Sequence, residues 1–162
     1  MERTAFQDKS FDCDCWGCGR RNDHGLGIKS YGSGDEAVCD WQPKAFHIAG
    51  PRNVLNGGII ATIIDCHSIC TAVAAAYRDE GRAMGADPPI RFVTGALNVS
   101  YLHPTAIDRP VTLRAAILET KPKKTVLRCS VHSNGKETAR GEVVAVRVPP
   151  DWNTLPLRGA GE

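Results

Sequence analysis

The segment NGGIIATIIDCHSICTAVAAAY, residues 56–77, decides how this 162-residue chain folds. Between Arg52 and Arg78 the only residue among Asp, Glu, Lys and Arg is Asp65, and the apolar residues show no strand-like alternation. Such a stretch predicts one long buried helix. A carboxylate inside it costs free energy unless it is neutralised, hydrogen-bonded or used in chemistry, so Asp65 is the first candidate functional residue. The structural alternative is a buried cap or a hydrogen-bonding group.

Two glycines, Gly57 and Gly58, open this helix. Because they lack side chains, a ligand can approach their backbone N–H groups closely, and the helix dipole favours negative charge at that end. The helix therefore carries both an acid and a donor site suited to an oxyanion.

Composition indicates an ordinary globular domain, with 42% hydrophobic and 23% charged residues. The formal charge is +2 and the basic residues are scattered, so we expect no nucleic-acid partner. Residues 1–14 contain no apolar signal segment, and Asp65, His67 and Ser68 interrupt the apolar helix, so we expect neither secretion nor membrane insertion. Seven cysteines in such a chain favour reduced thiols and a cytoplasmic location.

The chain divides into an irregular arm at 1–34, one domain at 35–150 and a flexible tail at 151–162. Alternating residues predict strands at 36–41, 91–102, 111–120, 125–132 and 138–148, with a turn at Ser133-Asn134-Gly135. Strict alternation places Thr94 on the strand face opposite Leu97 and Val99. One apolar helix without a helical partner requires a curved antiparallel sheet around it, which is an α+β fold, and a second copy would cover the remaining edges.

Three motifs occur in a set order and spacing: NGG at 56–58 with Asp65 seven residues later, LNVSYL at 97–102 with Pro104, and CWGCG at 15–19 with Gly25-Leu26. Through them, residues 13–148 resemble the hotdog-fold thioesterases, specifically the acyl-CoA thioesterases of the phenylacetate-degradation type. The resemblance implies a long central helix wrapped by a curved antiparallel sheet. It also implies a homodimer with continuous sheets, or a tetramer of two such dimers, and active sites at the subunit interface.

The resemblance further implies an acyl-CoA substrate, with coenzyme A as part of the substrate and no separate cofactor. In that family the residue matching Gly57 donates its N–H to the thioester carbonyl, with Gly58 beside it. The acid matching Asp65 comes from the partner subunit and attacks directly or activates water. Thr94 falls where some members place a hydroxyl that positions this water.

The chain departs from the family pattern before the glycine pair. Asn56 replaces the usual histidine, and Gly50 stands where several members have an asparagine, with Asn53 as the nearest substitute. We assign Asn56 to the catalytic group and Asn53, Ser68 and His67 to substrate binding. The alternative for Ser68 is tight packing of small residues on its helix face. The alternative for His67 is a hydrogen-bonded polar residue at the dimer interface.

Two cysteine-based sites are weaker hypotheses. Neighbouring Cys66 and His67 point about 100° apart on a helix, which disfavours a Cys–His nucleophile. The second hypothesis is a zinc site in the N-terminal arm, which no second Cys-x-x-Cys motif supports. Its candidate ligands are Cys13, Cys15, Cys18 and His24. We expect instead a tight glycine-rich turn that covers the pocket or the dimer edge, and no metal.

The sequence thus predicts a thioesterase for small or medium acyl-CoA, with acyl length set by Tyr77, Met84 and Phe92. A non-catalytic acyl-CoA binding protein is the alternative that Asn56 favours. A hydroxyacyl-thioester dehydratase is a further alternative, disfavoured because no histidine directly precedes the glycine pair.

Overall fold

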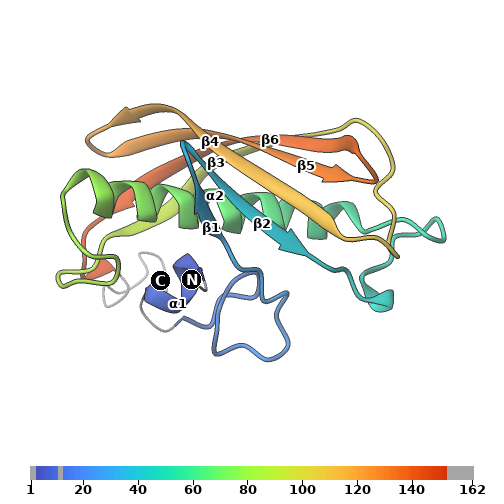
Figure 1. The fold of residues 1–162 in the computed structure, drawn as a ribbon, viewed down its shortest axis with the longest axis horizontal. Helices are drawn as coiled ribbons and strands as arrows, with labels where there is room; N and C mark the ends of the chain where they lie inside the picture. Colours follow the sequence, from blue (N-terminus) through green and yellow to red (C-terminus); the bar gives the residue numbers. More distant parts are fainter. Residues whose placement is uncertain (1–2, 11–12, 153–162) are drawn as a thin grey trace, which may run out of the picture.

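A computed structural model describes residues 3–10 and 13–152, so most of the expected tail, 153–162, lies outside the described residues. One helix crosses the face of a six-stranded antiparallel sheet (Figure 1). The helices are α1 (Phe6–Lys9) and α2 (Gly57–Asp79), with a short 3-10 turn at Ala45–His47. The strands are β1 (Tyr31–Ser33), β2 (Glu36–Trp41), β3 (Arg91–Tyr101), β4 (Val111–Lys121), β5 (Lys124–Ser133) and β6 (Lys136–Val148).

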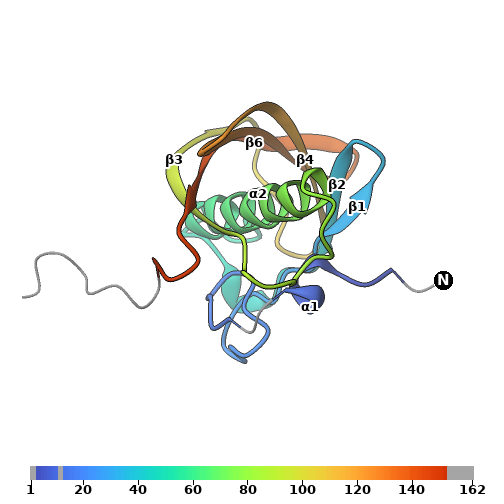
Figure 2. The ribbon, with the colours of Figure 1, turned by 90° about the vertical axis from the view of Figure 1, so that its left-hand side faces the viewer.

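Helix α2 lies between two layers, the curved sheet on one side and the N-terminal arm on the other (Figures 1 and 2). Ile63 and Ile64 are fully buried against the sheet. At Gly141 of β6 a Cβ atom would lie 2.6 Å from the Ile64 Cγ2, so the helix can approach the strand because that residue has no side chain. Helix α2 has the length and mean hydropathy of a membrane span, but here it is the core helix of the domain.

The predicted α+β hotdog architecture and the five expected strands are confirmed. The turn joining β5 to β6 has positive φ at Asn134 and Gly135, as the turn motif predicts. Sequence reasoning missed α1 and β1, which are too short to show periodicity. It also did not predict that β3 pairs with β6, which places β3 at the edge of the sheet in the order β1-β2-β4-β5-β6-β3.

Candidate functional site

The first turn of α2 is capped by Asn56. Its Oδ1 accepts hydrogen bonds from the Gly58 N–H at 2.8 Å and the Ile59 N–H at 3.2 Å. Within residues 3–10 and 13–152, no group accepts a hydrogen bond from the Gly57 N–H. An N-cap of this kind satisfies donors that the helix cannot satisfy itself. Of the two predicted glycine donors, Gly57 therefore remains available to a ligand and Gly58 is already engaged.

Tyr101, at the end of β3, holds this turn from the side. Its hydroxyl donates to the Gly57 carbonyl oxygen at 2.7 Å, and a Cβ added at Gly57 would lie 3.4 Å from the Tyr101 ring. Tyr101 is 55% exposed, so the glycine turn is at the surface of the single chain. Sequence reasoning placed Tyr101 in a family motif but did not connect it with Gly57, because nothing local links two positions 44 residues apart.

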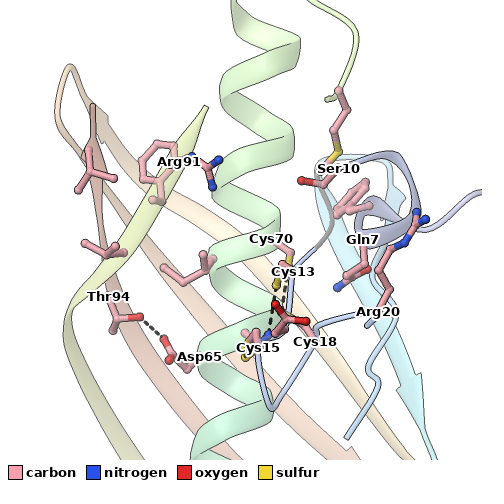
Figure 3. A pocket seen from close by; sticks show the side chains of 18 of the residues that line it. Gln7, Ser10, Cys13, Cys15, Cys18, Arg20, Asp65, Cys70, Arg91 and Thr94 are labelled. Carbon is pink, nitrogen blue, oxygen red and sulfur yellow. Dashed lines mark hydrogen bonds between the residues drawn. The ribbon is translucent and has the colours of Figure 1, made fainter. Parts of the chain in front are cut away.

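Asp65 lines a cavity of about 570 Å³ near the middle of α2 (Figure 3). The Thr94 hydroxyl donates to its Oδ1 at 2.5 Å. Burial raises the pKa of the Asp65 carboxyl, while the Thr94 hydrogen bond lowers it to a smaller extent. A half-buried carboxylate with a raised pKa and one positioned hydroxyl is a better general base than a solvated aspartate.

Thr94 reaches Asp65 because β3 contains a bulge at Gly95. The register with β6 shifts between Thr94 and Ala96, so Thr94 pairs with Ala145 while Leu97 pairs with Val143. The expected strand parity was therefore wrong: the extra residue turns Thr94 to the same face as Leu97, toward the helix. A pattern of alternation cannot reveal such a bulge, although the glycine is a weak signal for one.

His67 lies in the core, on the side of α2 away from the cavity. Its Nδ1 accepts from the Ser30 hydroxyl at 2.8 Å and its Nε2–H donates to the Ala37 carbonyl at 3.1 Å. Burial lowers the pKa of this imidazole to about 4, so it is neutral at physiological pH. This corrects the substrate-binding assignment, because both ring nitrogens are used inside the fold.

Ser68 and Asn53 are also away from the cavity. Ser68 is fully buried beside Cys129, which corrects its assignment to substrate binding. Asn53 is an exposed turn residue with φ 68°, and its carbonyl accepts from the Ile107 N–H at 3.0 Å. The turn conformation explains the asparagine, which tolerates positive φ better than most residues.

The cavity wall contains two of the three residues expected to set acyl length, Met84 and Phe92. Tyr77 is buried instead, with its hydroxyl between the Ile90 N–H and the Ala86 carbonyl. Three basic residues also line the cavity: Arg20, Arg21 and Arg91.

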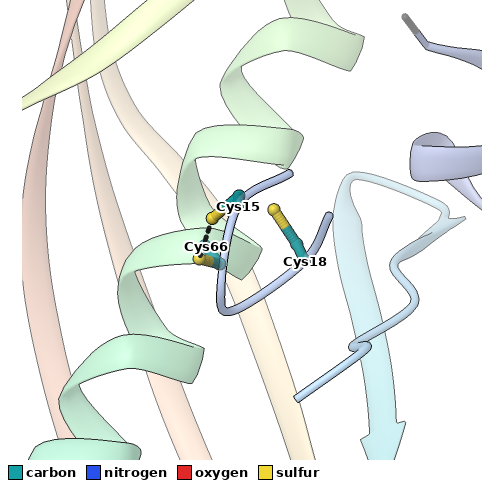
Figure 4. Close-up of side chains that lie close together, drawn as sticks. All are labelled: Cys15, Cys18 and Cys66. Carbon is teal, nitrogen blue, oxygen red and sulfur yellow. Dashed lines mark hydrogen bonds between the residues drawn. The ribbon is translucent and has the colours of Figure 1, made fainter. Parts of the chain in front are cut away.

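Cysteines from two parts of the chain meet at the same cavity. Cys15 and Cys18 from the arm lie within 4.8 Å of Cys66 on α2, measured between sulfur atoms (Figure 4). Cys18 also lies 4.0 Å from Cys70. Hydrogen bonds with the Cys15, Cys66 and Cys70 thiols lower the pKa of the Cys18 thiol. His24 does not belong to this group, so the predicted zinc ligand set does not assemble as expected.

Gly57 and Asp65 are eight residues apart on one helix, which separates them by about 12 Å along its axis. A thioester carbonyl and the water that attacks it are only about 3 Å apart. Within one chain the two groups therefore do not lie side by side.

The model of the thioesterase superfamily matches residues 52–140. A thioesterase superfamily protein from Shewanella loihica PV-4 is 35% identical, with a TM-score of 0.60 over 79% of this chain and 96% of that one. The E. coli PaaI protein of the phenylacetic acid degradation operon is 16% identical, with a TM-score of 0.63 over 76% and 81%. A Haemophilus influenzae thioesterase is 14% identical, with a TM-score of 0.63 over 84% of each chain. No curated protein matches the sequence significantly.

Proposed function

Because the chain belongs to the thioesterase superfamily, we propose that it hydrolyses small or medium acyl-CoA thioesters as a homodimer. The observation that carries this proposal is the position of Asp65, whose carboxyl lines the cavity, has a raised pKa and accepts from Thr94. A purely structural acid would be enclosed by packing instead.

In the proposed reaction the Gly57 N–H donates to the thioester carbonyl oxygen. Asp65 removes a proton from water as the water oxygen bonds to the carbonyl carbon, or attacks that carbon itself to form a mixed anhydride that a water molecule hydrolyses after the thiolate has left. The carbon–sulfur bond then breaks, and the departing coenzyme A thiolate takes up a proton. The donor stabilises the oxyanion in the transition state, where such a hydrogen bond is strongest.

A dimer supplies the two groups that one chain holds about 12 Å apart. Strand β3 is the natural contact, because among the described strands it is an edge strand that pairs only with β6. It also carries two exposed apolar side chains, Leu97 and Tyr101. An open edge with apolar residues favours pairing with a second copy, and a two-fold axis would bring Asp65 of each chain toward Gly57 of the other.

The cavity also fits the substrate class. Its volume of about 570 Å³ is ordinary for a small-molecule pocket. Arg20, Arg21 and Arg91 on its wall would attract the phosphates of coenzyme A. All seven cysteines are free thiols, which agrees with the reducing cytoplasm as the proposed location.

The test is release of free thiol from a panel of acyl-CoA substrates of increasing chain length. Asp65→Asn should lower kcat by about 10²- to 10⁴-fold, the usual contribution of a general base, while leaving substrate binding intact. Asp79→Asn, which removes an exposed acid from the same helix, is the matched control and should keep full activity. Wild type that binds acyl-CoA without turning it over would overturn hydrolysis.

That outcome would support a non-catalytic acyl-CoA binding protein. One observation favours it: Asn56 occupies the Gly58 N–H, so the glycine turn offers one donor fewer. A dehydratase fits less well, because the buried His47 uses its Nδ1 to accept from the Lys44 N–H.

A further inference from the structure

The thiol cluster, defined as Cys15, Cys18, Cys66 and Cys70, is a feature that thioester hydrolysis does not use. We propose that these four cysteines bind one Zn²⁺ ion in a closed tetrahedral site that fastens the N-terminal arm to α2. The proposal does not depend on the catalytic one.

The cluster is built from two cysteine pairs, each with a spacing that brings its sulfurs to one side. Cys15 and Cys18 form a Cys-x-x-Cys pair in the arm, a usual spacing for zinc ligands. Cys66 and Cys70 are four residues apart on α2, so they lie on one helix face. The sequence signal was therefore present, but as a helical pair rather than as a second Cys-x-x-Cys motif.

Two glycines allow the arm to bring its pair against the helix. A Cβ at Gly17 would lie 2.4 Å from the Cys66 sulfur, and a Cβ at Gly19 would lie 2.3 Å from the Cys15 nitrogen. The Gly19 N–H donates to the Cys15 carbonyl at 2.8 Å, which closes the turn. Both positions need glycine because the turn is tight and presses on the helix.

Three of the sulfur atoms, those of Cys15, Cys18 and Cys66, already lie within 4.8 Å of one another. The Cys70 sulfur lies outside that group, beside Cys18, and its side chain would turn toward the ion to complete the site. Cys15 and Cys66 are 3.7 Å apart, and Cys18 and Cys70 are 4.0 Å apart. Four sulfurs at 2.3 Å from a tetrahedral zinc ion are about 3.8 Å from each other. A disulfide would instead need about 2.05 Å.

The donor set selects the ion and its role. Thiolates are soft ligands that favour zinc over magnesium or calcium. Four protein ligands leave no open position for water or substrate, so the ion would be structural rather than catalytic. Cys13 is not required, since the four other cysteines already complete a tetrahedral site.

A closed site would explain how an arm with little regular structure is held in place. Residues 13–27 contain no helix or strand, yet Leu26 of this segment packs into the core, and its carbonyl accepts from the Trp41 indole at 2.8 Å. Metal binding to residues that come together only in the folded chain contributes directly to folding free energy.

The test is the metal content of the full chain, purified with reductant and without chelator, by elemental mass spectrometry. Wild type should contain about one zinc per chain, and Cys18→Ser and Cys70→Ser should each fall below about a tenth of that. Cys13→Ser and Cys129→Ala should keep their zinc, since Cys13 stands beside the cluster and Cys129 is buried elsewhere.

If a variant fails to fold, reconstitution of metal-depleted wild type with Co²⁺ provides an independent test of the site. Four thiolates around Co²⁺ give a strong sulfur-to-metal absorption and intense visible bands, and we expect both. Wild type without zinc and without that spectrum would overturn the proposal. Iron in place of zinc, zinc lost from Cys13→Ser but not Cys70→Ser, or a Cys15–Cys66 disulfide in reduced preparations would also overturn it.

Discussion

The N-terminal turn of α2, residues 56–58, and its central turn, residues 65–67, are built in different ways. The first is exposed and offers backbone, with the Asn56 cap and the Tyr101 hydroxyl fixing its geometry. The second is packed on most sides and offers side chains, with Asp65 facing the cavity and His67 facing the core.

The two turns therefore provide different kinds of functional group. A backbone donor needs only correct helix geometry, so it tolerates exposure and depends on a cap. A carboxylate needs a raised pKa, so it depends on burial and on a neighbour such as Thr94. The two turns should therefore respond differently to mutation.

Apart from Asp65→Asn, the largest expected effect is at the N-terminal turn. Gly57→Pro removes the proposed donor at the first helical position, where proline fits, and the ψ of 131° at Asn56 is compatible with a following proline. We expect kcat to fall by about 10²- to 10³-fold with little change in the thermal midpoint. Gly57→Ala keeps the N–H and should keep most of the activity. Equal loss in both variants would mean that the turn acts through shape and not as a donor.

A dimer that combines a Gly57 variant chain with an Asp65 variant chain tests whether the two turns act across the subunit interface. If each site uses Gly57 of one chain and Asp65 of the other, a mixed dimer of Gly57→Pro and Asp65→Asn chains has one intact site. Random mixing of refolded chains should restore about a quarter of wild-type activity. Recovery should not exceed the sum of the separate variants if each site takes both groups from one chain.

At the central turn, His67 should make stability depend on pH. Its folded pKa, about 4, lies below the unfolded value, so the folded state excludes a proton that the unfolded state binds. The contribution of neutral His67 to stability should be fully present above about pH 6.5. The free energy of unfolding should then fall by roughly 3 kcal/mol as the pH drops toward 4. Urea titrations of wild type and His67→Gln measure this. The same pH slope in both proteins would contradict it.

A smaller effect is expected at Thr94. Removing its hydroxyl in Thr94→Val takes away the hydrogen bond that lowers the pKa of Asp65, so that pKa should rise further. A base must be ionised to act, so the acidic limb of the pH profile of kcat/KM should move to higher pH. At low pH, kcat/KM should fall by less than about tenfold. Thr94→Ser keeps the hydroxyl and should keep the wild-type profile. If the acidic limb does not shift in Thr94→Val, the Thr94 hydroxyl does not influence the ionisation of Asp65.

The smallest effect is at the cap. Asn56→Ala should lower the free energy of unfolding by about 1 kcal/mol, because the Gly58 and Ile59 N–H groups lose their acceptor. Asn56→Asp keeps an acceptor and should be nearly neutral in chemical denaturation. Destabilisation of both variants to the same degree would show that Asn56 acts by some means other than capping.

Several parts of the site were predictable because they are local. Asp65 stands alone in an apolar stretch, and the glycine pair stands where a helix begins, so composition and spacing were enough to select both. His67 was assigned wrongly because its two partners, Ser30 and Ala37, are 37 and 30 residues away. Helical spacing shows that Asp65 and His67 point in different directions, but not which direction faces the cavity.

By itself, the sequence determined the long helix, the strands with clear alternation, the turn at Asn134-Gly135 and the family resemblance, because each follows from neighbouring residues. Only the tertiary structure decided that β3 lies beside β6, that a bulge turns Thr94 toward Asp65, and that arm cysteines meet helix cysteines. These depend on contacts between segments far apart in the chain. Their free energy comes from packing the whole domain, and no local pattern records it.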